Sequence, residues 1–179
     1  MNEASIEKFK SRFAHNGGET VVCENDGAAA EYLAALAGRQ KSGAENDGLR
    51  VELDTRRHVF LSRSIDGVLA FKLKASLEKV SDLVLMDKVS DSADICIASA
   101  SALLVQDGAL IIDSGRAAHE ETLFGEISVL VADEKTVLYD NMSQFFADAS
   151  AGKAFAGVDK AVIIAGPSKT ADIEKQVVL

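Results

Sequence analysis

The sequence predicts an α/β fold in which a mostly parallel sheet carries helices on both faces. Residues 83–86 and 109–112 are apolar over a whole strand length without alternation, which is typical of strands covered on both sides. Segments with helical spacing lie between such runs, and right-handed crossovers of this kind join parallel strands. The chain is 47% hydrophobic but only 6% aromatic, with no Trp, so its core must consist mostly of Ala, Val, Ile and Leu. Because 179 residues suit a single domain and no repeat or linker is apparent, we expect one domain over residues 1–179.

The N-terminal half predicts three helices, two strands and one polar loop. The first helix is indicated by Ile6, Phe9 and Phe13, which share one helical face. We expect that helix to stop at Gly17-Gly18. The elements expected after it, in chain order, are a strand at 20–23, a helix from Asn25 or Asp26 to about Gly38, a strand at 58–62 and a helix at 69–80. Residues 38–54 are polar and glycine-rich, so we expect a loop within the domain or a flap over it.

The C-terminal half predicts mainly strands. In order, we expect strands at 83–86, 93–98, 109–112, 127–131, 136–139 and 161–165. The short segment 136–139 is the expected edge strand. One further helix, capped by Asn141 or Ser143, would run through Phe145, Phe146 and Ala149.

The charge and the cysteines exclude several classes of function. A net charge of −9 removes the Lys and Arg excess that phosphate contacts need, so nucleic acid is not an expected partner. The first ten residues mix charges and lack the apolar run of a secretory signal, and no stretch reaches the ~18 apolar residues of a membrane span. We therefore expect a cytoplasmic protein. Cys23 and Cys96 stand alone in apolar settings, so we expect reduced core thiols and no bound metal, iron–sulfur cluster or other cofactor.

Three loops follow expected strands at the edge where open α/β sheets bind ligands: 99–108, 113–116 and 166–174. The last contains the only proline of the chain, Pro167, directly after a buried strand. There, Ser168 and Lys169 would offer a hydroxyl and a cation to a phosphate or carboxylate at a helix start. A purely structural alternative remains, in which Thr170 caps that helix and Asp172 interacts favourably with its dipole.

Residues 161–174, Ala-Val-Ile-Ile-Ala-Gly-Pro-Ser-Lys-Thr-Ala-Asp-Ile-Glu, closely resemble the C-terminal signature of the lactate-utilisation (LUD) domain family. Residues 93–98 and 106–112 match that family more weakly. The resemblance implies a fold similar to the sugar-phosphate isomerase and coenzyme A transferase superfold. It also implies a role in bacterial L-lactate oxidation beside iron–sulfur partner subunits.

The chain departs from the family at the loop 106–108. The family has Glu-Thr-Gly there, whereas this sequence has Gln106-Asp107-Gly108, and an amide cannot act as general base or nucleophile. Asp107 is adjacent, but neighbouring residues of a strand or turn project in different directions.

Two main hypotheses follow. In the first, the protein is an accessory subunit of lactate oxidation that binds a small anion through Gln106, Gly108, Gly166, Ser168, Lys169, Thr170, Asp172 and Glu174. In the second, it is an isomerase- or transferase-like enzyme acting on a small phosphorylated or carboxylate substrate, with Asp107 and Asp172 as candidate catalytic residues and Glu174 as a further acid or base. A structural subunit without a ligand is the third possibility, and the sequence leaves the oligomeric state open.

Overall fold

The computed structural model describes residues 3–39, 56–65, 67–88, 93–113, 125–150 and 161–166. Contacts divide the chain into two compact units. Unit 1 comprises Met1–Val21, Ala100–Gly115 and Ala132–Leu179, and unit 2 comprises Val22–Ser99 and Arg116–Val131. Of the helices in the described ranges, none combines the length and the apolar character needed to cross a membrane.

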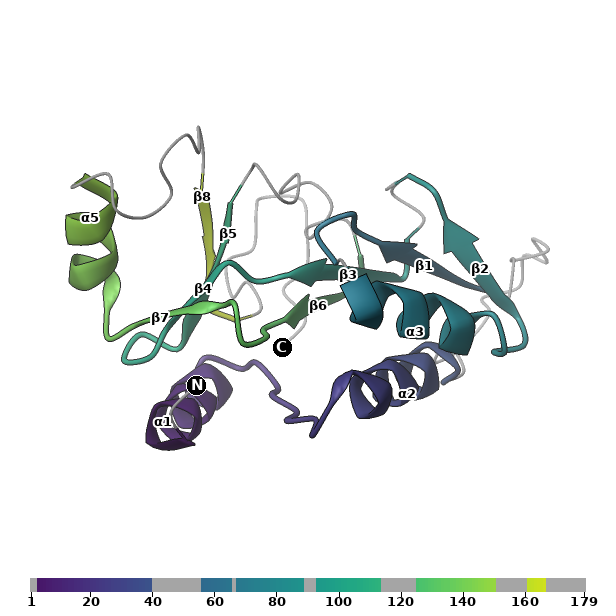
Figure 1. The fold of residues 1–179 in the computed structure, drawn as a ribbon, viewed down its shortest axis with the longest axis horizontal. Helices are drawn as coiled ribbons and strands as arrows, with labels where there is room; N and C mark the ends of the chain where they lie inside the picture. The colour runs from purple at the N-terminus through teal and green to yellow at the C-terminus, as the bar shows by residue number, and fades with distance from the viewer. Residues whose placement is uncertain are drawn as a thin grey trace, which may run out of the picture. The chain divides into compact units, whose positions relative to one another are not determined.

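Unit 2 is built on a four-stranded, fully parallel sheet, sheet A (Figure 1). Its strands are β1 (Arg57–Leu61), β2 (Leu83–Met86), β3 (Ile95–Ser99) and β6 (Ile127–Val131), in the order β2-β1-β3-β6. All four coincide with predicted strands to within one or two residues. Sheet A confirms the predicted α/β class with a mostly parallel sheet.

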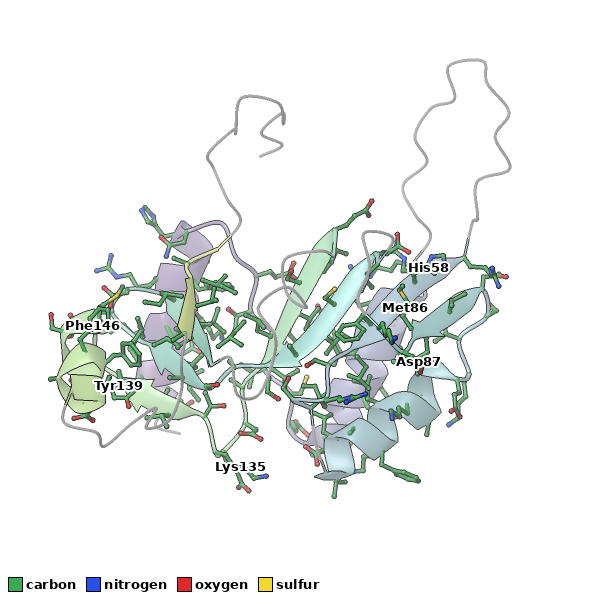
Figure 2. The ribbon with its side chains drawn as sticks, turned by 90° about the horizontal axis from the view of Figure 1, so that it is seen from above. His58, Met86, Asp87, Lys135, Tyr139 and Phe146 are labelled. Atoms are coloured by element: carbon green, nitrogen blue, oxygen red, sulfur yellow. The ribbon has the colours of Figure 1, made fainter. Side chains whose placement is uncertain are left out.

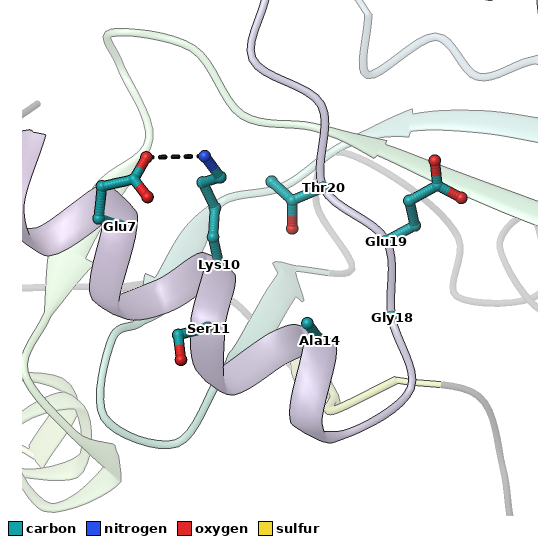
Figure 3. A pocket seen from close by; sticks show the side chains of 7 residues that line it. All are labelled: Glu7, Lys10, Ser11, Ala14, Gly18, Glu19 and Thr20. Atoms are coloured by element: carbon teal, nitrogen blue, oxygen red, sulfur yellow. Dashed lines mark hydrogen bonds and ion pairs between the residues drawn. The ribbon is translucent and has the colours of Figure 1, made fainter.

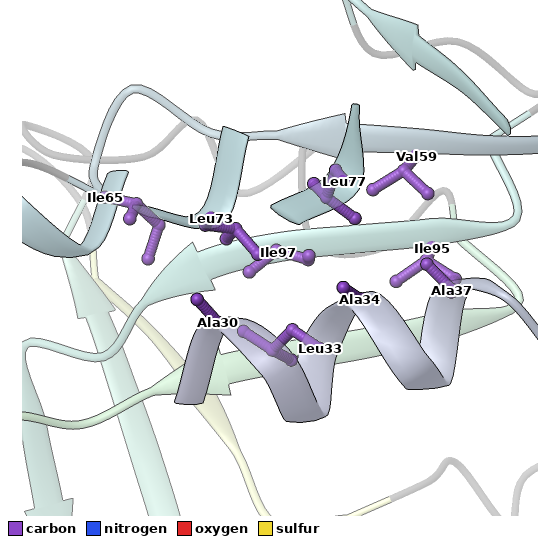
Figure 4. Packing of buried hydrophobic residues seen from close by; sticks show 10 residues of the cluster. All are labelled: Ala30, Leu33, Ala34, Ala37, Val59, Ile65, Leu73, Leu77, Ile95 and Ile97. Atoms are coloured by element: carbon purple, nitrogen blue, oxygen red, sulfur yellow. The ribbon is translucent and has the colours of Figure 1, made fainter. Parts of the chain in front are cut away.

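Two helices of unit 2, α2 (Asp26–Ala37) and α3 (Gly67–Leu77), pack together on one face of sheet A (Figure 4). The Asn25 carboxamide oxygen accepts hydrogen bonds from the backbone N–H groups of Gly27 and Ala28, so Asn25 is the predicted cap of α2. The buried side chains of this interface are Ala30, Leu33, Ala34, Ala37, Val59, Ile65, Leu73, Leu77, Ile95 and Ile97. Alternate residues of the strands, Phe60 and Cys96, form a second cluster with Ala93.

The strand predicted at residues 20–23 is wrong. This segment lies outside every strand, and the side chains of Val21 and Val22 are 45% and 62% exposed. β-branched residues favour strands because they fit a pleated, half-buried surface, so the preference has no effect where no neighbouring strand provides that surface.

Unit 1 contains a second sheet, sheet B, with mixed pairing. Its strands are β4 (Ala102–Leu104), β5 (Ala109–Asp113), β7 (Val137–Tyr139) and β8 (Ala161–Ile164), in the order β7-β4-β5-β8. β7 is an edge strand, as predicted, and is parallel to β4, whereas β5 is antiparallel to both β4 and β8. Strand β4 was not predicted from the sequence, and the expectation of parallel crossovers in this part of the chain is wrong. The chain between β4 and β5 is too short for a crossover, so it forms a hairpin.

In its described residues, unit 1 has two helices, α1 (Glu3–His15) and α5 (Met142–Ser150). In α1 the buried Phe9 stacks on Phe13, with ring centroids 5.5 Å apart, which confirms the predicted apolar face. In α5 the buried Phe145 meets the ring of Tyr139 from β7 edge-on, with centroids 5.6 Å apart. The Asn141 side chain caps α5 by accepting a hydrogen bond from the Gln144 N–H.

Candidate functional site

Antiparallel pairing of β5 with β8 brings two of the predicted site segments to one edge of sheet B. Leu110 lies opposite Ile164, so Gly108, just before β5, and Gly166, just after β8, lie at the same edge. The expected reason, that the loops 99–108, 113–116 and 166–174 all follow strands at one carboxyl edge, is wrong, because β3 belongs to the other sheet and β5 is antiparallel to β8. Asp113 at the end of β5 lies opposite Ala161, so the segment 113–116 begins at the other edge. Five of the proposed ligand-binding residues lie outside the described ranges: Ser168, Lys169, Thr170, Asp172 and Glu174.

The C-terminal end of α1 joins these two segments. The Asn16 carboxamide donates hydrogen bonds to the carbonyl oxygens of Asp107 (3.0 Å) and Gly108 (3.1 Å). Gly166 lies so close to Asn16 that a Cβ added there would overlap the Asn16 carbonyl oxygen. We call this arrangement of Asn16, the 106–108 turn and Gly166 the α1 corner. Sequence reasoning missed Asn16, since nothing local links it to a turn about ninety residues away.

Two glycines of the α1 corner have backbone conformations in the left-handed region, which favours glycine. Gly108 has φ +58° and Gly166 has φ +105°. A Cβ on Gly108 would lie 2.5 Å from the backbone carbon of Arg12 and 2.6 Å from the nitrogen of Phe13. The close approach of α1 to the 106–108 turn therefore depends on glycine at this position.

Asp107 already has a structural partner. Its carboxylate accepts a hydrogen bond of 2.8 Å from the backbone N–H of Met142, the first residue of α5. An acceptor for a free N–H group at a helix N-terminus is favourable, so this contact stabilises the start of α5. The Gln106 backbone N–H donates to the Asp140 carbonyl, and the side chains of Gln106 and Asp107 are both exposed. Proton transfer by Asp107 would weaken the start of α5.

An open groove of about 400 Å³ lies beside α1, also within unit 1 (Figure 3). It is lined by Glu7, Lys10, Ser11, Ala14, Gly18, Glu19 and Thr20. Its one lysine, Lys10, is 2.7 Å from the Glu7 carboxylate, and Glu19 adds a second negative charge. This charge pattern does not favour an anion in the groove.

A histidine–carboxylate pair lies in unit 2, at the amino ends of β1 and β3. His58 belongs to β1 (Figure 2). Its Nδ1 is 3.7 Å from Asp94 Oδ2, and the same oxygen accepts a hydrogen bond of 2.6 Å from the His58 backbone N–H. Asp94 is buried and its backbone N–H donates to the His58 carbonyl. Asp94 thus holds β1 and β3 in register. In the described part of the chain, no three His, Cys, Asp or Glu side chains are grouped as metal ligands would be.

Comparison with known proteins assigns the chain to a family. No curated protein and no solved structure matches it. The family model described as the LUD domain matches residues 6–179, nearly the whole chain. Membership of this family points to involvement in lactate utilisation. The match includes the signature at 161–174 and accords with the α/β fold, and the chain therefore belongs to the LUD domain family.

Proposed function

We propose that the protein is an accessory, small-anion-binding subunit of L-lactate oxidation, acting in the bacterial cytoplasm beside iron–sulfur partner proteins. Membership of the LUD domain family supports a role in the use of lactate. The observation that carries the binding role is the α1 corner, where Asn16 lies against both the 106–108 turn and Gly166, the first residue of the Gly-Pro-Ser-Lys-Thr motif. Lys169 and Ser168 would supply the cation and the hydroxyl for a carboxylate. In this proposal the redox cofactors belong to the partners, and this chain binds none.

The surroundings of Asp107 favour an accessory role over an enzymatic one. Gln106 is a neutral amide where the family resemblance would place a glutamate, and the Asp107 carboxylate is bonded to the start of α5. Neither side chain is therefore placed to accept a proton from a substrate at little cost. No observation of the described residues favours the isomerase- or transferase-like alternative, which the binding experiment would reveal as turnover.

Growth on L-lactate tests whether the protein acts in lactate oxidation. Deleting the gene should impair growth on L-lactate but not on glucose, and the wild-type gene should restore it. A Lys169→Ala gene should fail to restore growth, whereas Lys8→Ala, which removes an exposed lysine of α1, should succeed. Unchanged growth of the deletion strain on L-lactate, with no paralogue to compensate, would contradict the proposal.

Binding of small anions to the purified protein tests the proposed site. The purified protein should be stabilised against thermal unfolding by L-lactate or pyruvate more than by sugar phosphates or coenzyme A. Lys169→Ala should abolish that stabilisation, and Lys8→Ala should retain it. If none of the four compounds stabilises the protein, it is a structural subunit and the proposal is wrong. Turnover of a compound that disappears when Asp107 and Asp172 are both changed to Ala would instead establish the enzyme alternative.

A further inference from the structure

The end of α1 holds Asn16 in a defined place. Asn16 follows the last residue of the helix, and its backbone N–H donates to the Arg12 carbonyl (3.1 Å), which continues the hydrogen-bond pattern of α1. The next residue, Gly17, has φ +90°, and its N–H donates to the Ala14 carbonyl at 3.0 Å. A left-handed glycine of this kind is a common way to end a helix. The geometry of the helix end therefore sets the position from which the Asn16 side chain extends.

The Asn16 carboxamide uses both of its N–H groups on the 106–108 turn. Its Nδ2 atom donates to the carbonyl oxygens of Asp107 and Gly108, two successive residues of that turn. A carboxamide has two N–H donors and one oxygen acceptor. No donor therefore remains for an anion, and an acceptor oxygen does not bind one. Asn16 can affect the binding of an anion only through the turn whose carbonyl groups it holds.

Asn16 also lies against Gly166, the first residue of the Gly-Pro-Ser-Lys-Thr motif. A Cβ on Gly166 would overlap the Asn16 carbonyl oxygen and would lie 3.3 Å from the Asn16 Cβ. The side chain of Asn16 thus binds one segment of the α1 corner while its backbone packs on the other. All the residues that make these contacts belong to unit 1. A single residue outside both segments therefore fixes how the turn and Gly166 are placed.

We infer that Asn16 is a positioning residue of the small-anion site proposed above, which it serves by holding the 106–108 turn and Gly166 in place before the ligand binds. The inference rests on the proposed function, because it assigns Asn16 a role in that same site. Binding groups that are held in place in advance lower the entropic cost of binding, so their supporting contacts affect affinity without touching the ligand. Asn16 is such a support, and loss of its carboxamide should weaken binding of the anion.

The test measures the affinity of the purified full-length protein for L-lactate and for pyruvate by isothermal titration calorimetry, well below the melting temperature. Asn16→Leu keeps the branched shape of the side chain without its donors or an added charge, and Asn16→Ala removes most of the side chain. Both variants should bind roughly five- to thirtyfold more weakly, the factor that one to two ordinary hydrogen bonds represent. Asn25→Ala is the matched control, because it also removes two hydrogen bonds at a helix end, but in unit 2. It should bind as tightly as the wild type.

The wild type and the variants report on different claims. If the wild type binds an anion and both Asn16 variants bind it as tightly, the inference is overturned while the proposed function stands. If Asn25→Ala weakens binding as much as the Asn16 variants do, the effect is a general loss of stability and the inference is again overturned. If the wild type binds neither compound, the proposed function fails and the inference fails with it. Failure in the wild type is thus distinguished from failure in the variants alone.

Discussion

Replacing Gly108 with Ala should destabilise the protein strongly, because two independent costs fall on the same residue. Gly108 has φ +58°, a region that costs an Ala roughly 1–2 kcal/mol. The added Cβ would also press on the backbone of Arg12 and Phe13 at 2.5 and 2.6 Å, and overpacking of this kind costs about 1–3 kcal/mol. The expected loss of stability is therefore about 2–5 kcal/mol, against a typical total of about 5–15 kcal/mol.

Gly67 offers a matched control for this prediction. Its φ is +62°, almost the same as that of Gly108, but no atom lies within 4 Å of an added Cβ. Gly67→Ala should therefore carry only the backbone cost of about 1–2 kcal/mol. Thermal unfolding followed by far-ultraviolet circular dichroism measures the loss of stability in both variants. Each kcal/mol lost should lower the melting temperature by about 2–4 °C. If Gly108→Ala melts no lower than Gly67→Ala, α1 does not approach the 106–108 turn as described.

Three further predictions concern local contacts. Asn25→Ala should lower the free energy of unfolding by about 0.5–2 kcal/mol, because two N–H groups at the start of α2 lose their acceptor. Asn25→Asp should keep most of this stability in thermal unfolding. An equal loss in both variants would contradict the cap. Asp107→Ala should lower the free energy of unfolding by about 1 kcal/mol, because it removes the acceptor of the Met142 N–H, and Asp107→Asn should lower it less. Unchanged midpoints of denaturant unfolding would refute this contact. Burial, and then the nearby Asp148 carboxylate, raise the pKa of Tyr139 above 10.0. Its contribution to stability should be complete below pH 10 and should fall as pH rises towards the folded-state pKa, because the unfolded chain ionises first; an absorbance titration that gives Tyr139 an ordinary pKa in the folded protein would refute this.

Helices and most strands were predictable because their signals are local. The capping side chain of Asn25 lies two and three residues from the N–H groups it binds, and the stripe Ile6, Phe9 and Phe13 follows the 3.6-residue period. The predicted strand at 20–23 failed although its residues favour strands, since a strand also needs a neighbour.

Strand direction and partners were decided only by the tertiary structure. The apolar residues of β5 and β8 show that these strands are covered, but apolar runs do not distinguish parallel from antiparallel neighbours. Antiparallel pairing brings Gly108 beside Gly166, and Asn16 then bonds to a turn far along the chain. Residue periodicity and capping act over a few residues, whereas this arrangement arises from contacts between distant segments, which no short stretch of sequence specifies.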